Sequence, residues 1–187
     1  EIYCADVASE LAGEILPAQA FPDSPETVLL VHYSWAIKFD AWMRRLACRK
    51  ALVYHNITPE EFFDKDSWFD RTSRFSRQQL AELKPLFSGA IALSPYSARE
   101  LHGMGFDPVD VVPLLFDPAP WQTAPYDVAR LKALQDDGAF KLFFVGRLVE
   151  NKRQHDLVRR VAALRPFMQR RVHLTPHAAG GAAGGWR

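Results

Sequence analysis

Short apolar segments alternate with helical patterns along this sequence, and this alternation limits the possible folds more than any other feature. Strands are predicted near residues 2–4, 28–32, 51–54, 90–93, 109–112 and 141–145. Helical patterns lie between several of them, over residues 36–48, 71–87 and 95–101. Strands joined through helices form parallel sheets, because a parallel connection must cross back over the sheet. The sequence therefore predicts an α/β fold in which the first five strands share one Rossmann-like parallel sheet.

Capping residues mark two of the predicted junctions. Ser94-Pro95 combines a favoured N-cap with a proline suited to the first helical position. After the strand at 51–54, Thr58, Pro59 and Glu61 have the spacing of a capping box. We therefore expect a helix soon after His55, so that this histidine lies on a short, stiff turn.

Polar side chains follow two of the predicted strands at the point where each strand ends. His32 follows the strand that reaches Val31, and His55 and Asn56 follow the strand that reaches Tyr54. In open α/β sheets, ligands bind in the crevice outside the carboxyl ends of the strands. These residues are therefore placed where a pocket could form. For His32, a role in capping the next helix is an equally good interpretation.

The last predicted strand is followed by a glycine and then by a second helical pattern. The apolar run 142–145 ends at Gly146, and Asn151 with Gln154 has the spacing of a capping box. Pro166 marks the expected end of that helix. The unit is therefore predicted to be a strand, a glycine turn, a basic loop and a helix.

Two basic residues flank the expected start of this helix. The N-terminus of a helix attracts anions through its unpaired N–H groups and its dipole. Arg147 offers a planar fork to phosphate oxygens, and Lys152 offers a mobile point charge. The pair could therefore bind a diphosphate. The alternative interpretation, an ordinary solvated basic loop, fits the same spacing equally well.

The composition limits the class of protein. The chain has 187 residues, 48% of them hydrophobic, and a formal net charge of only +1. These values exclude general disorder and a globally basic nucleic-acid-binding protein. Cys4 and Cys48 form no CxxC pair and no cluster with histidines, which indicates reduced thiols in a cytoplasmic protein and no metal site. No apolar run reaches about 18 residues, so we expect at most peripheral contact with the inner face of a membrane.

Segments rich in proline, glycine and polar residues indicate where one domain ends and the next begins. We expect a partial N-terminal domain over residues 1–120, a linker over 121–138, and the start of a second domain over 139–166. Residues 167–187 are expected to be a disordered tail of low complexity, since their Gly/Ala repetition buries little apolar surface. The sequence begins as though within a domain.

Several segments resemble one known family. The run 145–152, Val-Gly-Arg-Leu-Val-Glu-Asn-Lys, is similar to the opening of the C-terminal domain in GT-B glycosyltransferases of the family-4 (group 1) type. The run 53–63, Val-Tyr-His-Asn-Ile-Thr-Pro-Glu-Glu-Phe-Phe, resembles a signature of the same group. The strand end at 31–34 and the serine segment at 92–98 also match. Together the resemblance covers most of residues 1–166.

The resemblance implies a hexosyltransferase-type enzyme with two Rossmann-like domains. Such an enzyme moves a sugar from a UDP- or GDP-sugar to a glycan or lipid-linked acceptor, retains the anomeric configuration, and uses neither a cofactor nor a metal. Carried over to this sequence, the donor diphosphate would be held by Gly146, Arg147 and Lys152. His55 would be the catalytic residue beside the transferred sugar, and His32 and Asn56 would line the sugar or acceptor pocket.

The sequence also departs from the family pattern. The glycine-rich acceptor loop of the family would precede residue 1, and its pair of donor-binding glutamates would follow residue 187. Two alternatives therefore stay open. One is a truncated, non-catalytic glycosyltransferase fragment, and the other is a GT-B-like sugar-nucleotide epimerase of the same two-domain shape.

Overall fold

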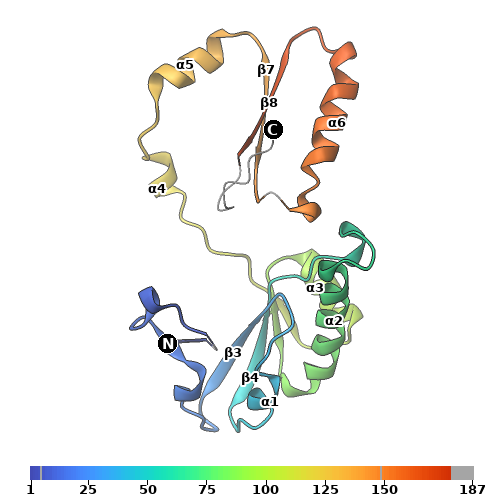
Figure 1. The fold of residues 1–187 in the computed structure, drawn as a ribbon. Coiled ribbons are helices and arrows are strands. Elements are labelled where there is room, and N and C mark those ends of the chain that lie inside the picture. Colours follow the sequence, from blue (N-terminus) through green and yellow to red (C-terminus); the bar gives the residue numbers. More distant parts are fainter. Residues whose placement is uncertain (5, 148, 178–187) are drawn as a thin grey trace. The chain divides into compact units, whose positions relative to one another are not determined.

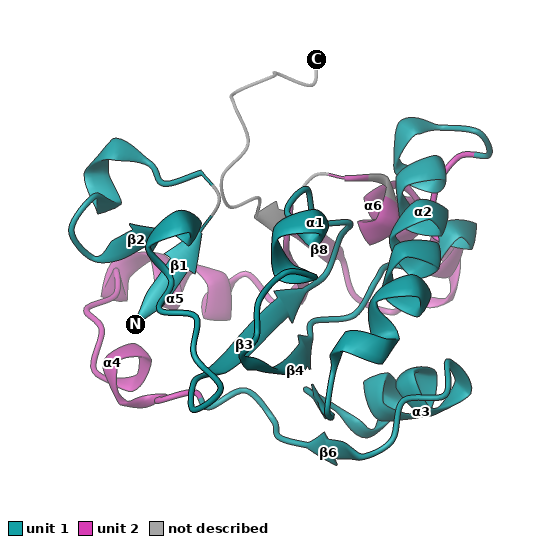
Figure 2. Ribbon diagram, turned by 90° about the horizontal axis from the view of Figure 1, so that it is seen from below, with its two compact units in different colours: residues 1–61, 65–115 teal, residues 62–64, 116–187 magenta. Residues whose placement is uncertain are grey.

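The computed structural model describes residues 1–4, 6–147 and 149–177, which are shown as a ribbon in Figure 1. The chain divides into two compact units, coloured separately in Figure 2. The first unit comprises Glu1–Glu61 and Lys65–Leu115, and the second comprises Phe62–Asp64 and Phe116–Arg187. Each unit is described by itself below.

A parallel sheet of four strands forms the centre of the first unit. Its strands are β3 (Val28–Tyr33), β4 (Arg49–Tyr54), β5 (Ala90–Ala92) and β6 (Val109–Val111), and they are paired in that order. All three pairings are parallel, and Tyr33, Tyr54 and Ala92 lie side by side near the carboxyl ends of β3, β4 and β5. The prediction of an α/β fold with a parallel sheet is therefore confirmed.

The first predicted strand does not join this sheet. β1 (Ile2–Cys4) pairs in parallel with β2 (Ile15–Pro17), which the sequence analysis missed. The short 3-10 turn η1 (Ser9–Leu11) lies between the two strands, and η2 (Ala18–Ala20) follows β2. The prediction of five strands in one sheet is therefore wrong for residues 2–4. The three residues of β2 end in a proline, and so short an apolar segment carries almost no strand signal.

Two helices complete the core of the first unit. They are α2 (Trp68–Leu83), which continues into the 3-10 turn η4 (Lys84–Leu86), and α3 (Pro95–Gly103). Ser94 caps α3 as predicted, because its hydroxyl accepts a hydrogen bond from the Ser97 amide at 3.2 Å. Fully buried residues from β3, β4, β5, α2 and α3 form this core. Leu52 of β4, Leu80 of α2 and Leu101 of α3 are examples.

Two predicted helices of the first unit are much shorter than expected. The pattern at 36–48 yields only α1 (Asp40–Met43), because the carboxylate of Asp23 accepts hydrogen bonds from the amides of Ala47 and Cys48 and holds them outside a helix. The capping box at Thr58 yields only the 3-10 turn η3 (Glu60–Phe62). Both predictions failed because side chains distant in sequence bind the backbone there.

The second unit contains a two-stranded parallel sheet. β7 (Phe140–Val145) pairs with β8 (Val172–His177), and between them lie η5 (Glu150–Lys152), α6 (Gln154–Leu164) and η6 (Arg165–Phe167). The unit begins with α4 (Ala119–Gln122) and α5 (Val128–Asp136), the second of which lies within the segment predicted as a linker.

The strand β8 corrects the expectation of a disordered tail. Residues 167–187 were expected to be disordered, yet residues 172–177 form a full set of parallel pairs with β7. The reason is that Val172 and Leu174 alternate with polar residues, which is a strand pattern that the nearby Gly/Ala repetition obscured. Residues 178–187 lie outside the described part of the chain. No helix in the described part is both long and apolar enough to cross a membrane.

Candidate functional site

The structure brings His32 and His55 together at the carboxyl edge of the four-stranded sheet. β3 and β4 are parallel neighbours with Tyr33 opposite Tyr54, so His55, the next residue, emerges beside the end of β3. Its amide donates to the Tyr33 carbonyl at 2.9 Å. The ring nitrogens His32 Nδ1 and His55 Nε2 are 2.6 Å apart, and both residues are exposed. Both histidines thus lie near one sheet edge as predicted, although His32 belongs to β3 and does not follow it.

The two imidazoles constrain each other's protonation. At 2.6 Å one facing nitrogen must carry a hydrogen and the other must accept it, so the two facing nitrogens hold one proton between them. Burial, and secondly the nearby His32, lower the pKa of His55 below its usual value. Near neutral pH the pair therefore favours an uncharged His55 that can both donate and accept hydrogen bonds.

This pair gives a testable pH dependence. We expect the pKa of His55 to lie below about 6.5, its usual value, and to rise when His32→Gln removes the neighbouring ring. The contribution of neutral His55 to folding stability is fully present above the pKa that His55 has in the unfolded chain. It is lost as the pH falls through the lower pKa of the folded state, because the unfolded chain binds the proton first. NMR titration of the imidazole resonances measures the pKa of His55 in the wild type and in the variant. His102→Gln is the control, and a His55 that titrates at or above its usual value would contradict the assignment.

The loop after β4 is held in place by helix α2. The Arg77 guanidinium donates to the Ile57 carbonyl at 2.8 Å, and the Ser73 hydroxyl donates to the Thr58 carbonyl at 2.6 Å. On the other side, the Ile57 amide donates to the Tyr54 hydroxyl at 3.0 Å. These bonds replace the expected helix after His55. They hold the histidine on a turn that is fixed, as predicted, but by other means.

The loop after β3 is held by the same helix. Gln79 exchanges two hydrogen bonds with the backbone of Ile37, at 2.8 and 2.9 Å, and the Ser76 hydroxyl accepts from the Ala36 amide at 2.8 Å. The buried Tyr33 hydroxyl donates to the Ser76 carbonyl at 2.7 Å. Both loops at this sheet edge are therefore fixed by buried or partly buried polar side chains of α2.

Asn56 occupies an unusual position in this loop. Its φ is +69°, in the left-handed region that asparagine tolerates better than most residues. Its Oδ1 atom is buried and has no hydrogen-bond partner among the described residues. Asn56 therefore follows His55 in a left-handed turn, and its place in a sugar or acceptor pocket stays a prediction.

A group of aromatic residues lies at the same sheet edge, and no sequence pattern predicted it. Trp35 follows the end of β3, and its ring centroid is 6.3 Å from that of Trp68 and 6.4 Å from that of Phe69. Trp68 and Phe69 form the first turn of α2 and meet edge to face at 5.0 Å. We call these three residues the aromatic cluster. No local pattern links Trp35 with α2, so only the fold reveals it.

In the second unit, the basic loop between β7 and α6 differs in detail from its prediction. The helix begins at Gln154, and its N-cap residue is Arg153, which has a φ of +50° and no side-chain capping bond. The predicted capping box of Asn151 and Gln154 is therefore wrong. Instead, the Gln154 side chain donates to the Arg147 carbonyl at 2.6 Å, which closes the loop on itself.

Both predicted phosphate ligands of this loop are exposed. Neither Arg147 nor Lys152 forms an ion pair with any side chain that the structure describes. The first turn of α6 already contains Asp156, whose pKa is lowered chiefly by its hydrogen bond from Arg153. Because this carboxylate partly neutralises the helix N-terminus, a diphosphate would depend on the two side chains. Gly146 packs closely, since a Cβ there would lie 3.3 Å from the Phe144 ring.

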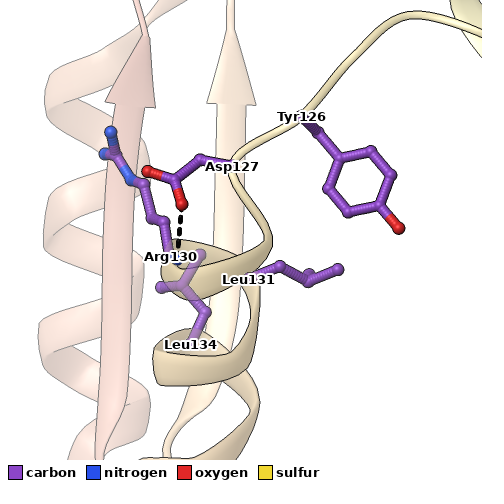
Figure 3. Close-up of a pocket in the computed structure, with 5 residues that line it drawn as sticks. All are labelled: Tyr126, Asp127, Arg130, Leu131 and Leu134. Carbon is purple, nitrogen blue, oxygen red and sulfur yellow. Dashed lines mark hydrogen bonds between the residues drawn. The ribbon is translucent and has the colours of Figure 1, made fainter.

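A shallow hollow also lies beside α5 in the second unit (Figure 3). It has a volume of about 340 Å³ and is lined by Tyr126, Asp127, Arg130, Leu131 and Leu134. Within it, Asp127 caps the helix by accepting from the Arg130 amide at 2.9 Å. The hollow contains none of the predicted site residues.

The chain matches no family model, no curated protein and no solved structure. What defines its class is therefore the architecture itself, an α/β protein with a four-stranded parallel sheet and a cluster of polar and aromatic residues at the carboxyl edge. Among the described residues, no group of three or more His, Cys, Asp or Glu side chains could hold a metal ion.

Proposed function

We propose that the chain is a glycosyltransferase-type protein that binds a nucleotide sugar through the loop between β7 and α6. The observation that carries the proposal is this loop, in which a strand, Gly146, exposed Arg147 and Lys152, and a helix follow one another. Neither basic side chain has an ion-pair partner among the residues that the structure describes, so both can bind phosphate oxygens. The resemblance to GT-B glycosyltransferases of the family-4 type supplies the expected ligand, a UDP- or GDP-sugar.

The proposed chemistry assigns roles to the residues of each unit. The bond between the anomeric carbon and the diphosphate breaks, and an acceptor hydroxyl bonds to that carbon with retention of configuration. The proton of that hydroxyl passes to the departing diphosphate. Arg147 and Lys152 stabilise the negative charge that develops on the leaving group, which is commonly the largest contribution to such catalysis. His55, fixed by the loop after β4, orients the sugar or the acceptor through hydrogen bonds.

Calorimetric titration of UDP and GDP tests the proposed donor site. Arg147→Ala or Lys152→Ala is expected to weaken binding about tenfold or more, because each removes a charge-assisted hydrogen bond worth about 1.5–3 kcal/mol. Lys132→Ala and Arg170→Ala are matched controls, since both residues are exposed and lie outside the loop. Binding that is unchanged by both loop substitutions, or no binding of either nucleotide, would contradict the proposal.

A further inference from the structure

The aromatic cluster combines a half-buried Trp35 with two exposed rings, those of Trp68 and Phe69. Trp68 is 62% exposed and Phe69 is 40% exposed, although both belong to a helix whose opposite face is in the core. The side chains of Ser76 and Gln79 fix the loop that carries Trp35. A cluster of large apolar rings exposed at a fixed position indicates a binding surface.

The cluster lies close to the two histidines. Trp35 is only three residues beyond His32, so their Cα atoms are at most about 11 Å apart. The loop that follows His32 therefore carries one of the apolar rings, and the imidazole nitrogens of His32 and His55 donate and accept hydrogen bonds. Ligand sites commonly combine aromatic walls with a few polar groups that fix orientation.

We propose that the aromatic cluster binds a pyranose ring of a carbohydrate, with His32 and His55 hydrogen-bonded to its hydroxyl groups. The C–H face of a pyranose is apolar and slightly positive, so it complements the negative face of an indole or phenyl ring. The hydroxyls around its rim match the polar groups of the histidine pair. This inference rests on the proposed function, and it specifies that the acceptor is a glycan whose sugar ring is recognised in the first unit.

The local charge favours a glycan over a membrane surface. Residues 60–77, which include Trp68 and Phe69, contain five acidic and four basic residues, and Asp70 and Glu60 are paired with Arg74 and Arg77. Anionic lipid headgroups are attracted by clusters of lysine and arginine. A segment without an excess of positive charge gives anionic headgroups no such attraction, and it presents no barrier to an uncharged sugar.

Binding of the whole chain to an array of pyranose-containing glycans tests this proposal without any nucleotide. We expect retention on glucose- or galactose-configured glycans, and at least a tenfold loss with Trp68→Ala. Trp121→Ala is the matched control, because Trp121 is 74% exposed and belongs to the second unit. His55→Gln is expected to weaken binding by a smaller factor, since it removes one hydrogen-bonding ring and leaves the aromatic cluster intact.

The outcomes separate this inference from the proposed donor site. No glycan binding, or binding that Trp68→Ala leaves unchanged, would overturn the inference, whether or not UDP or GDP binds. Flotation with phosphatidylcholine–phosphatidylglycerol vesicles provides the second arm. Vesicle binding that is abolished by Trp68→Ala would assign the cluster to a lipid surface and also overturn the inference.

Discussion

Replacing Arg77 with methionine is expected to lower the free energy of unfolding of the first unit by about 3 kcal/mol. The guanidinium bonds to the Ile57 carbonyl at 2.8 Å and to Glu100 at 2.9 Å, and its side chain is only 25% exposed. Methionine keeps much of the packing volume but leaves the partly buried Glu100 without its charged partner. Breaking such pairs costs about 3–5 kcal/mol when they are fully buried and less when they are partly exposed.

The same substitution should also release the loop that carries His55. Urea denaturation measures the loss of stability, and the imidazole resonances of His32 and His55 report the loop. Arg71→Met is the matched control, because Arg71 lies on α2, is exposed, and makes its hydrogen bond to the Asp66 carbonyl at the surface. We expect it to cost less than about 1 kcal/mol. Equal losses for the two variants would contradict the role assigned to Arg77.

Hydrogen exchange is expected to be at least about a hundredfold faster in β7 and α6 than in β4, a difference of about 2.7 kcal/mol in opening free energy. In the described chain, all buried residues lie between Ala18 and Phe106, which is within the first unit. In β7, by contrast, Phe143 is 61% exposed and Val145 is 72% exposed. With little apolar surface buried, the second unit gains little stability to oppose local opening.

Mass spectrometry of exchanged peptides, corrected for intrinsic rates, measures this difference. A peptide over residues 50–54 reports β4, and one over residues 140–145 reports β7. The segment at Leu114 and Leu115 serves as a reference for unprotected amides, since these side chains are 72% and 100% exposed. Protection of β7 equal to that of β4 would show that the second unit is as well packed as the first.

Local sequence patterns predicted the central sheet and part of the site. The four strands of the first sheet were found because each is a short apolar run, and the start of α3 was found because Ser94-Pro95 is a local capping signal. The placement of His32 and His55 at one carboxyl edge followed from the same reasoning, whereas their direct contact depends on the strand order, which was not predicted. These features depend on residues close together in sequence.

Contacts between distant residues could not be predicted in the same way. Asp23 ends the helical pattern at 36–48, and Ser73 binds the carbonyl of Thr58, which was expected to begin a helix. The pairing of Trp35 with Trp68 likewise exists only after α2 has packed on the sheet. The local sequence around a hydrogen-bonding side chain does not indicate its partner when dozens of residues separate the two.

The polar face of α2 has a consequence for how this protein could change during evolution. Ser73, Ser76 and Gln79 are buried and bind the two loops that position the histidines and Trp35. A substitution at any of them would disturb the proposed ligand-binding loops and the stability of the fold together. Adaptation to a new ligand is therefore easier through exposed positions such as Trp68, which can vary without disturbing the scaffold.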